Sequence, residues 1–93
     1  VCVYQFDPDS YYNAGVIIAE TVVDPFFSAL NEQVEDHCFG EQYALKYQQG
    51  RVSAIADIDG ANLPDCYRSL LDRFSIKANV VAPLLKGETL WGL

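Results

Sequence analysis

The sequence is poor in the residues that build metal centres and disulfide frameworks. It has one histidine, three cysteines and no methionine among 93 residues. An odd and sparse set of cysteines does not match the dense frameworks of small secreted proteins, so we expect a reducing, cytoplasmic setting. The chain has no Cys-x-x-Cys pair, and a zinc site therefore lacks ligands. We expect no metal.

Basic residues and long apolar runs are also scarce. Six lysines and arginines stand against 13 acidic residues, which gives a net charge of −7 and a pI near 4.3. Such a chain repels phosphate, so we expect no nucleic-acid partner. No apolar run approaches the roughly 18 residues that span a bilayer, and we expect no direct membrane insertion.

What is present is a folded core. Hydrophobic residues make up 51% of the chain and aromatic residues 13%, which excludes disorder. The length favours one domain over residues 1–93, which buries roughly 60–70% of its extended surface. Val1 and Leu93 both lie in strand-like patterns. We therefore expect a fragment of a longer domain, with terminal elements missing.

The apolar pattern predicts strands at both ends of the chain and helices between them. Val- and Ile-rich or alternating segments predict strands at residues 1–6, 14–23, 52–58, 76–85 and 88–93. The first two strands are expected to pair as a hairpin, and Lys86-Gly87 to form the turn of another. The fold class is therefore α+β, with helices packed on one face of an antiparallel sheet.

Three helices are expected in the middle of the chain. Apolar spacing predicts a short helix over residues 26–34 and another over 40–48, which Gly50 ends. The clearest helix covers residues 63–74, with Asn62 as its cap and Pro64 in its first turn. Cys66 lies three residues after Leu63, so we expect it on the apolar face of this helix.

Cys38 and Cys66 are the candidate reactive residues. Each is consistent with a buried, inert thiol, because free cysteine is among the most buried residue types. The alternative is a pair of nucleophilic thiols that react with one ligand. The residue types alone leave both interpretations open.

Two motifs resemble a known family. Residues 36–39, Asp-His-Cys-Phe, resemble the Asp-Xaa-Cys-Phe motif of blue/green cyanobacteriochromes, which are bilin-binding GAF domains related to phytochromes. Residues 63–85 are similar to the helix with the primary bilin-attachment cysteine and the strand after it. Residues 3–6, 19–22 and 90–93 resemble other strands of that family. The resemblance implies a partial GAF domain over residues 1–93, with a GAF-like antiparallel sheet.

The resemblance also implies a cofactor, a linear tetrapyrrole such as phycocyanobilin or phycoviolobilin. Cys66 matches the cysteine that holds the pigment through a thioether. Cys38 matches the second cysteine, which adds reversibly to the central methine bridge and shifts absorption to the blue. Light-driven isomerisation of a double bond releases this second bond.

Three further residues receive roles from the same resemblance. Asp36 would face the pyrrole N–H groups, and Arg51 would clamp a propionate, to which its planar guanidinium is suited. Tyr67 stands where most relatives have a histidine that bonds the bilin, and it keeps an O–H group but no basic nitrogen. From residue type alone, Asp36 also suits a turn and Arg51 a solvated surface.

Other positions depart from the family or stay open. Asp59 stands where relatives often have Tyr, and Asn62 where Gly is common. Tyr11 and Tyr12 are candidates for packing beside the pigment or for plain surface cover.

The leading hypothesis is a photosensory signalling domain, with self-catalysed pigment attachment and no other enzyme activity. In the family, its partners are adjacent signalling domains. The alternative is a GAF domain that senses another small ligand, or thiol redox state through a disulfide between Cys38 and Cys66. A disulfide requires Cα atoms within roughly 7 Å, whereas bilin binding requires a shared pocket of several hundred Å³. A hydrolase or transferase has little support, because the chain lacks a nucleophile elbow and a phosphate-binding glycine loop.

Overall fold

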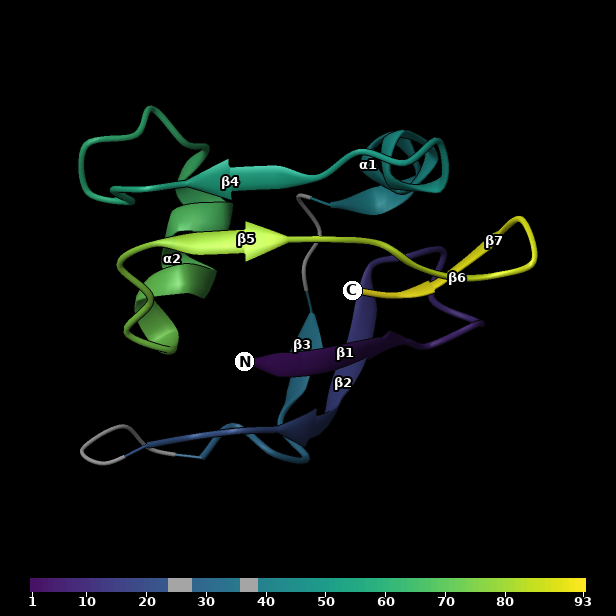
Figure 1. Ribbon diagram of the computed structural model, residues 1–93, viewed down its shortest axis with the longest axis horizontal. Coiled ribbons are helices and arrows are strands. Elements are labelled where there is room, and N and C mark those ends of the chain that lie inside the picture. The colour runs from purple at the N-terminus through teal and green to yellow at the C-terminus, as the bar shows by residue number, and fades with distance from the viewer. Residues whose placement is uncertain (24–27, 36–38) are drawn as a thin grey trace.

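The computed structural model describes residues 1–23, 28–35 and 39–93. The chain forms strands and helices in this order: β1 (Cys2–Phe6), β2 (Ala14–Glu20), β3 (Gln33–Glu35), α1 (Gly40–Gln48), β4 (Ser53–Ile55), α2 (Asp65–Arg73), β5 (Asn79–Val81), β6 (Leu84–Lys86) and β7 (Thr89–Gly92). Figure 1 shows α1 and α2 beside the strands. The expected α+β class, an antiparallel sheet with helices, is confirmed.

Five strands form one sheet in the order β3-β2-β1-β7-β6. The expected hairpin of β1 and β2 is confirmed, with antiparallel pairs that run from Cys2↔Glu20 to Phe6↔Gly15. The second expected hairpin, β6 and β7, turns at Gly87, whose φ of +63° suits a residue without a Cβ. The ends of the described chain thus meet in the middle of the sheet, where β1 pairs with β7.

A separate ribbon of β4 and β5 is antiparallel, with Ser53 opposite Val81 and Ile55 opposite Asn79. A single strand over residues 76–85 was expected, but β5 ends at Val81 and β6 begins at Leu84. Pro83 lies between them and has no backbone N–H to donate to a ladder. The chain therefore leaves the ribbon at β5 and enters the five-stranded sheet at β6 (Figure 1).

The two helices agree with the pattern of the sequence, apart from one cap. α1 has the expected bounds, and Gly50 follows it at a φ of +98°. α2 begins after Pro64, which makes no side-chain capping bond, so the prediction of Asn62 as the cap is wrong. Pro64 suits this place because the first N–H groups of a helix have no partner within the helix.

The helix expected over residues 26–34 is wrong where the structure describes it. Gln33–Glu35 is a strand, and Val34 is buried and paired with Gly15 of β2. The apolar residues of this segment have a helical spacing, but alternation around Val34 is also compatible with a strand. Residues 24–27 lie outside the described residues.

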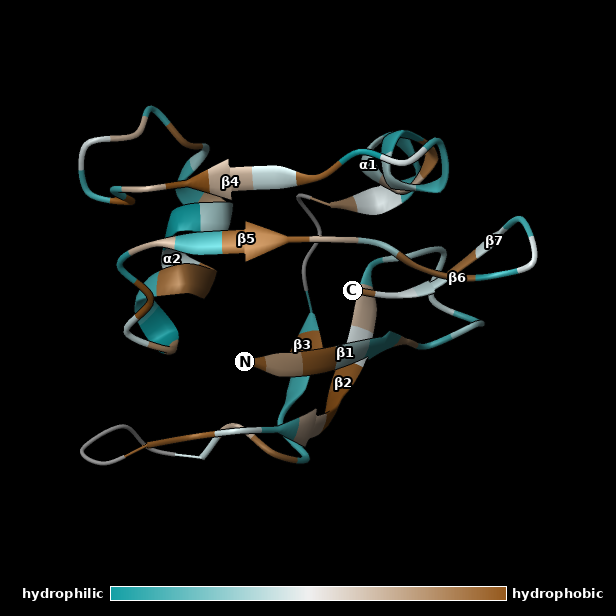
Figure 2. Ribbon diagram, viewed as in Figure 1, coloured by the Kyte–Doolittle hydropathy of each residue, from teal (hydrophilic) through white to brown (hydrophobic). Residues whose placement is uncertain are grey.

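The core lies between α1 and one face of the sheet. Phe6, Ala44, Tyr47 and Leu90 form a buried cluster, and Val81 packs against it. Hydrophobic residues concentrate in the strands, whereas much of α2 is hydrophilic (Figure 2). Asn79 is two residues from Val81 on β5, so both side chains face the side on which α1 packs.

Candidate functional site

Cys66 is the second residue of α2 and is exposed. Cys66 was expected on the apolar face of this helix, and the interpretation of it as a buried, inert thiol does not hold, because Leu71 is the buried residue of α2. Cys66 lies in the first turn of the helix, where the unpaired backbone N–H groups carry partial positive charge.

The structure records Cys66 as disulfide-bonded. The other cysteine that it describes, Cys2, is free and exposed on β1. A sulfur in a disulfide is not a nucleophile, so attack on a carbon requires prior reduction. The predictions for Asp36 and Cys38 lie outside the described residues, and the structure does not test them.

Arg51 lies just after α1, and its guanidinium sits over two tyrosine rings. The guanidinium carbon is 5.9 Å from the centre of the Tyr43 ring and 5.6 Å from that of Tyr47. Arg51 is exposed and takes part in none of the salt bridges between described residues. Its charge is therefore open to a carboxylate that approaches from solvent. The role that the resemblance implies for Arg51, the clamping of a propionate, stays a prediction.

Tyr67 follows Cys66 and is half-buried. Its hydroxyl oxygen accepts a hydrogen bond of 3.3 Å from Asn79 Nδ2, which joins α2 to β5. The Asn79 Oδ1 atom is buried and has no partner. A buried acceptor without a donor costs about 1–3 kcal/mol, so the structure leaves one polar requirement unmet beside Tyr67.

Tyr47 is the third aromatic residue of this region and was not selected from the sequence. Burial raises the pKa of the Tyr47 phenol, and the nearby Tyr67 phenol raises it further. The Arg51 guanidinium and the Ser53 side chain act in the opposite direction on this pKa. Polar groups from α1, α2, β4 and β5 therefore come together on one side of the ribbon. We call Arg51, Tyr47, Ser53, Tyr67 and Asn79 the polar cluster.

Ser53 and Asn79 were also missed in the sequence. Each is a polar residue of a short strand, and the β4–β5 register places both on the same face as Val81. In the sequence, the available signal for both residues was a polar side chain at an inward-facing position of a strand whose other inward-facing positions are apolar.

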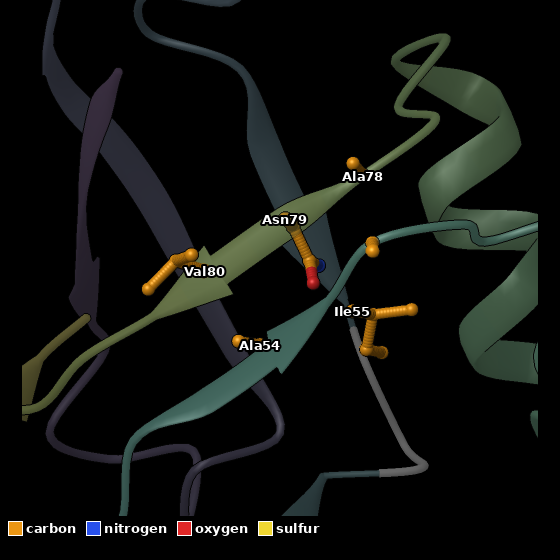
Figure 3. A pocket seen from close by; sticks show the side chains of 6 residues that line it. Ala54, Ile55, Ala78, Asn79 and Val80 are labelled. Atoms are coloured by element: carbon orange, nitrogen blue, oxygen red, sulfur yellow. The ribbon is translucent and has the colours of Figure 1, made fainter.

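A pocket of about 390 Å³ lies on the β4–β5 ribbon. Figure 3 shows that Asn79 and Val80 leave β5 in different directions, and that Ile55 lies across from Asn79. Six residues line the pocket: Ala54, Ile55, Ala56, Ala78, Asn79 and Val80. Cys66 is not among these walls, so this pocket is not the shared pocket that the resemblance implies. Asn79 borders the pocket, but most of the walls belong to the face of the ribbon opposite to the polar cluster.

The structure also places the other residues that the sequence singled out. Tyr12 packs against Phe6 with ring centres 5.1 Å apart, whereas Tyr11 is 73% exposed. Asp59 forms salt bridges with Arg68 at 2.9 Å and Lys77 at 3.7 Å.

Among the described residues, no group of three or more His, Cys, Asp or Glu side chains is placed to hold a metal ion. None of the described helices has the length and apolarity to cross a membrane.

Comparison with known proteins gives a consistent family. The GAF domain model matches residues 1–93. A predicted methyl-accepting chemotaxis protein from Synechocystis sp. is 40% identical over 93 residues, which are 100% of this chain and 9% of that protein. The circadian input-output histidine kinase CikA of the same organism is 36% identical over 67 residues, which are 69% of this chain and 9% of the kinase.

Solved structures resemble the fold closely. The PixJ GAF domain of Thermosynechococcus elongatus, in its blue-light absorbing form, superposes with a TM-score of 0.87 at 35% identity. The alignment covers 98% of this chain and 52% of that one. A red/green cyanobacteriochrome in its red light-absorbing state superposes with a TM-score of 0.77 at 29% identity, over 98% of this chain and 59% of that one. The chain thus spans a little over half of these domains.

Proposed function

Since the chain belongs to the GAF domain family, we propose that it is the core of a photosensory domain that binds a linear tetrapyrrole covalently. The observation that carries this proposal is the fold, which superposes on cyanobacteriochrome GAF domains over 98% of the chain. Phycocyanobilin or phycoviolobilin is the proposed cofactor. When bound, it supplies absorption of visible light and a double bond that isomerises.

The residues of the site fit such a group. An exposed cysteine in a disulfide, an exposed guanidinium and a buried acceptor without a partner lie on α2, after α1 and on β5. A bilin presents matching chemistry, since it has carboxylates for Arg51 and pyrrole N–H groups for an acceptor. The surrounding tyrosines and aliphatic side chains suit its apolar rings.

Cys66 would form the permanent tether. Once reduced, its sulfur would add to a carbon–carbon double bond of the pigment side chain: one S–C bond would form, the π bond would break and the thiol proton would go to the neighbouring carbon. This addition needs no oxidant. It does need a free thiol, and an external thiol supplies the two electrons and two protons that reduce the Cys66 disulfide.

Cys38 and Asp36 complete the proposal. Cys38 would add reversibly to the central bridge of the pigment, which shortens the conjugated system and shifts absorption to the blue. Asp36 would accept hydrogen bonds from the pyrrole N–H groups, which stabilises its charged form. The domain would act as a signalling module in the cytoplasm, next to output domains such as those of chemotaxis receptors and histidine kinases.

Absorption before and after illumination tests this function. The protein is co-expressed with the enzymes of bilin synthesis, purified under reducing conditions, and compared with a preparation that lacks those enzymes. We expect two forms that interconvert under light of different colours. A protein without visible absorption in both preparations contradicts the proposal.

The disulfide-bonded state of Cys66 favours a second candidate, a thiol redox sensor. Alkylation followed by mass spectrometry distinguishes the two functions. A redox sensor forms this disulfide when an oxidant such as hydrogen peroxide is added, loses it when a thiol reductant is added, and takes up no pigment. A photosensory domain has a reduced, alkylated Cys66 before the pigment is attached.

A further inference from the structure

Asn79 borders the pocket of the β4–β5 ribbon, but its amide points away from the face that Val80 lines and towards the residue next to the proposed tether. It is one of the walls of the pocket, and its amide reaches Tyr67. Its neighbour Val80 is 71% exposed and faces the other way, as the alternation of a strand requires. The amide therefore faces the side on which α2 lies.

The direction of the hydrogen bond decides what Tyr67 can do. Asn79 Nδ2 is the donor, so the Tyr67 oxygen is an acceptor in this pair and its own proton points elsewhere. No other hydrogen bond between described residues involves the Tyr67 hydroxyl. The proton is thus available to an acceptor that the described part of the chain does not supply.

The second atom of the amide strengthens this interpretation. Asn79 Oδ1 is buried without a donor. If Asn79 served only to join β5 to α2, the unpaired Oδ1 would bring no benefit. An apolar side chain of similar size would avoid the free-energy cost of burying this acceptor. A ligand that carries both N–H donors and oxygen acceptors satisfies both atoms, once a small movement of the side chains admits it.

We infer that Asn79 is a positioning residue, which turns the Tyr67 hydroxyl into a hydrogen-bond donor towards an oxygen of the bound tetrapyrrole. Its own Oδ1 accepts an N–H of the same ligand. This inference rests on the proposed function. It adds a residue that the sequence did not single out, and it explains how a tyrosine serves beside the attachment cysteine.

The first test uses the pigment-free protein. If the unmet acceptor is a cost carried for the ligand, Asn79→Leu melts at the same temperature as the wild type or higher. The exposed Asn62 supplies the control variant, Asn62→Ala, which leaves the melting temperature unchanged. A clear fall in melting temperature for Asn79→Leu, together with unchanged pigment binding, shows a structural role only and overturns the inference.

The second test measures non-covalent bilin affinity in a Cys66→Ala background, so that attachment does not mask binding. Tyr67→Phe removes one hydrogen bond to the ligand and is expected to weaken binding about fivefold. Asn79→Leu removes the bond to Oδ1 and also the orientation of the Tyr67 hydroxyl, so its loss is expected to be larger. Because Asn79 acts partly through Tyr67, the loss of affinity in the double variant is expected to be smaller than the product of the two single losses. Fully independent losses contradict the positioning role.

Covalent loading separates this inference from the proposed function. With Cys66 intact, both single variants are expected to retain attached pigment and to shift its absorption maximum in the same direction. Attached pigment with unchanged absorption in both variants overturns the inference alone. A wild-type protein that attaches no bilin overturns the proposed function, and the inference with it.

Discussion

The Arg51 guanidinium lies 5.6 Å from the centre of the Tyr47 ring, so a cation just after α1 rests on an aromatic residue of the core. The contact holds the charge of Arg51 within the polar cluster while leaving it exposed. A surface arginine without such a ring beneath it would sample many side-chain conformations. Binding of a carboxylate would then cost more side-chain entropy than it does at Arg51.

Replacement of Arg51 by alanine is expected to weaken non-covalent bilin binding about fivefold, because an exposed ion pair contributes at most about 1 kcal/mol. Lys46 is the matched control. Its ammonium lies 5.1 Å from the centre of the Tyr43 ring, but it is not over Tyr47. We expect Lys46→Ala to bind as the wild type in the same titration. Equal losses in the two variants would mean that net charge, and not the position of Arg51, controls binding.

Cys38→Ala is expected to leave the pigment attached and to remove the blue-absorbing form, because the second sulfur is the proposed cause of the blue shift. Absorption spectra of the illuminated and dark-adapted protein check this. Persistence of the blue form in the variant would exclude Cys38 from that role.

The raised pKa of Tyr47 predicts a loss of stability in alkali. In the unfolded chain this phenol ionises near its ordinary pKa of 10.0, whereas the folded protein keeps it neutral to higher pH. Below the unfolded pKa, Tyr47 is protonated in both the folded and the unfolded state. As the pH rises above the unfolded pKa, the unfolded state loses this proton first, so the free energy of unfolding falls until the folded pKa is reached.

Urea denaturation at about pH 8 and about pH 11 measures this loss. Tyr47→Phe is expected to lose less stability between the two conditions than the wild type. The control is Tyr11→Phe, since Tyr11 is 73% exposed. An identical alkaline loss in wild type and Tyr47→Phe would show that other groups cause it.

Gly92→Ala is expected to destabilise the sheet by about 1–3 kcal/mol or more, the range for overpacking. A Cβ at Gly92 would collide with the backbone carbonyl oxygen of Tyr4, where β1 and β7 pair. Thr89→Ala, at an exposed position of the same strand, is the control. The urea midpoint should fall for the glycine variant only, and equal midpoints would contradict the close approach of these strands.

Local chemistry explains which parts of the fold the sequence predicts. α1, the β1–β2 hairpin and the turn at Gly87 follow from residue types and spacing within one segment. β3 does not, because a strand of three residues has a single buried side chain, Val34, and its partner Gly15 lies far back in the chain. The break at Pro83 was available in the sequence, because proline cannot donate to a ladder.

The same distinction holds for the site. Residue type and resemblance selected Cys66, Arg51 and Tyr67, but not their surroundings. Tyr47 and Asn79 join the polar cluster only because α1 and β5 pack on a common side, which no local pattern shows. The exposure of Cys66 also contradicts its apolar helical spacing. At nine residues, α2 buries little more than Leu71.

The most direct test of the account is zinc-induced fluorescence of the denatured, pigment-loaded protein on a gel, since only covalently held bilin survives denaturation. The wild type and Cys2→Ala, which removes the free and exposed cysteine of β1, are expected to fluoresce. Cys66→Ala is expected to show no fluorescent band. A fluorescent Cys66→Ala protein, or a reduced wild type that never fluoresces, would contradict the tether on which the account depends.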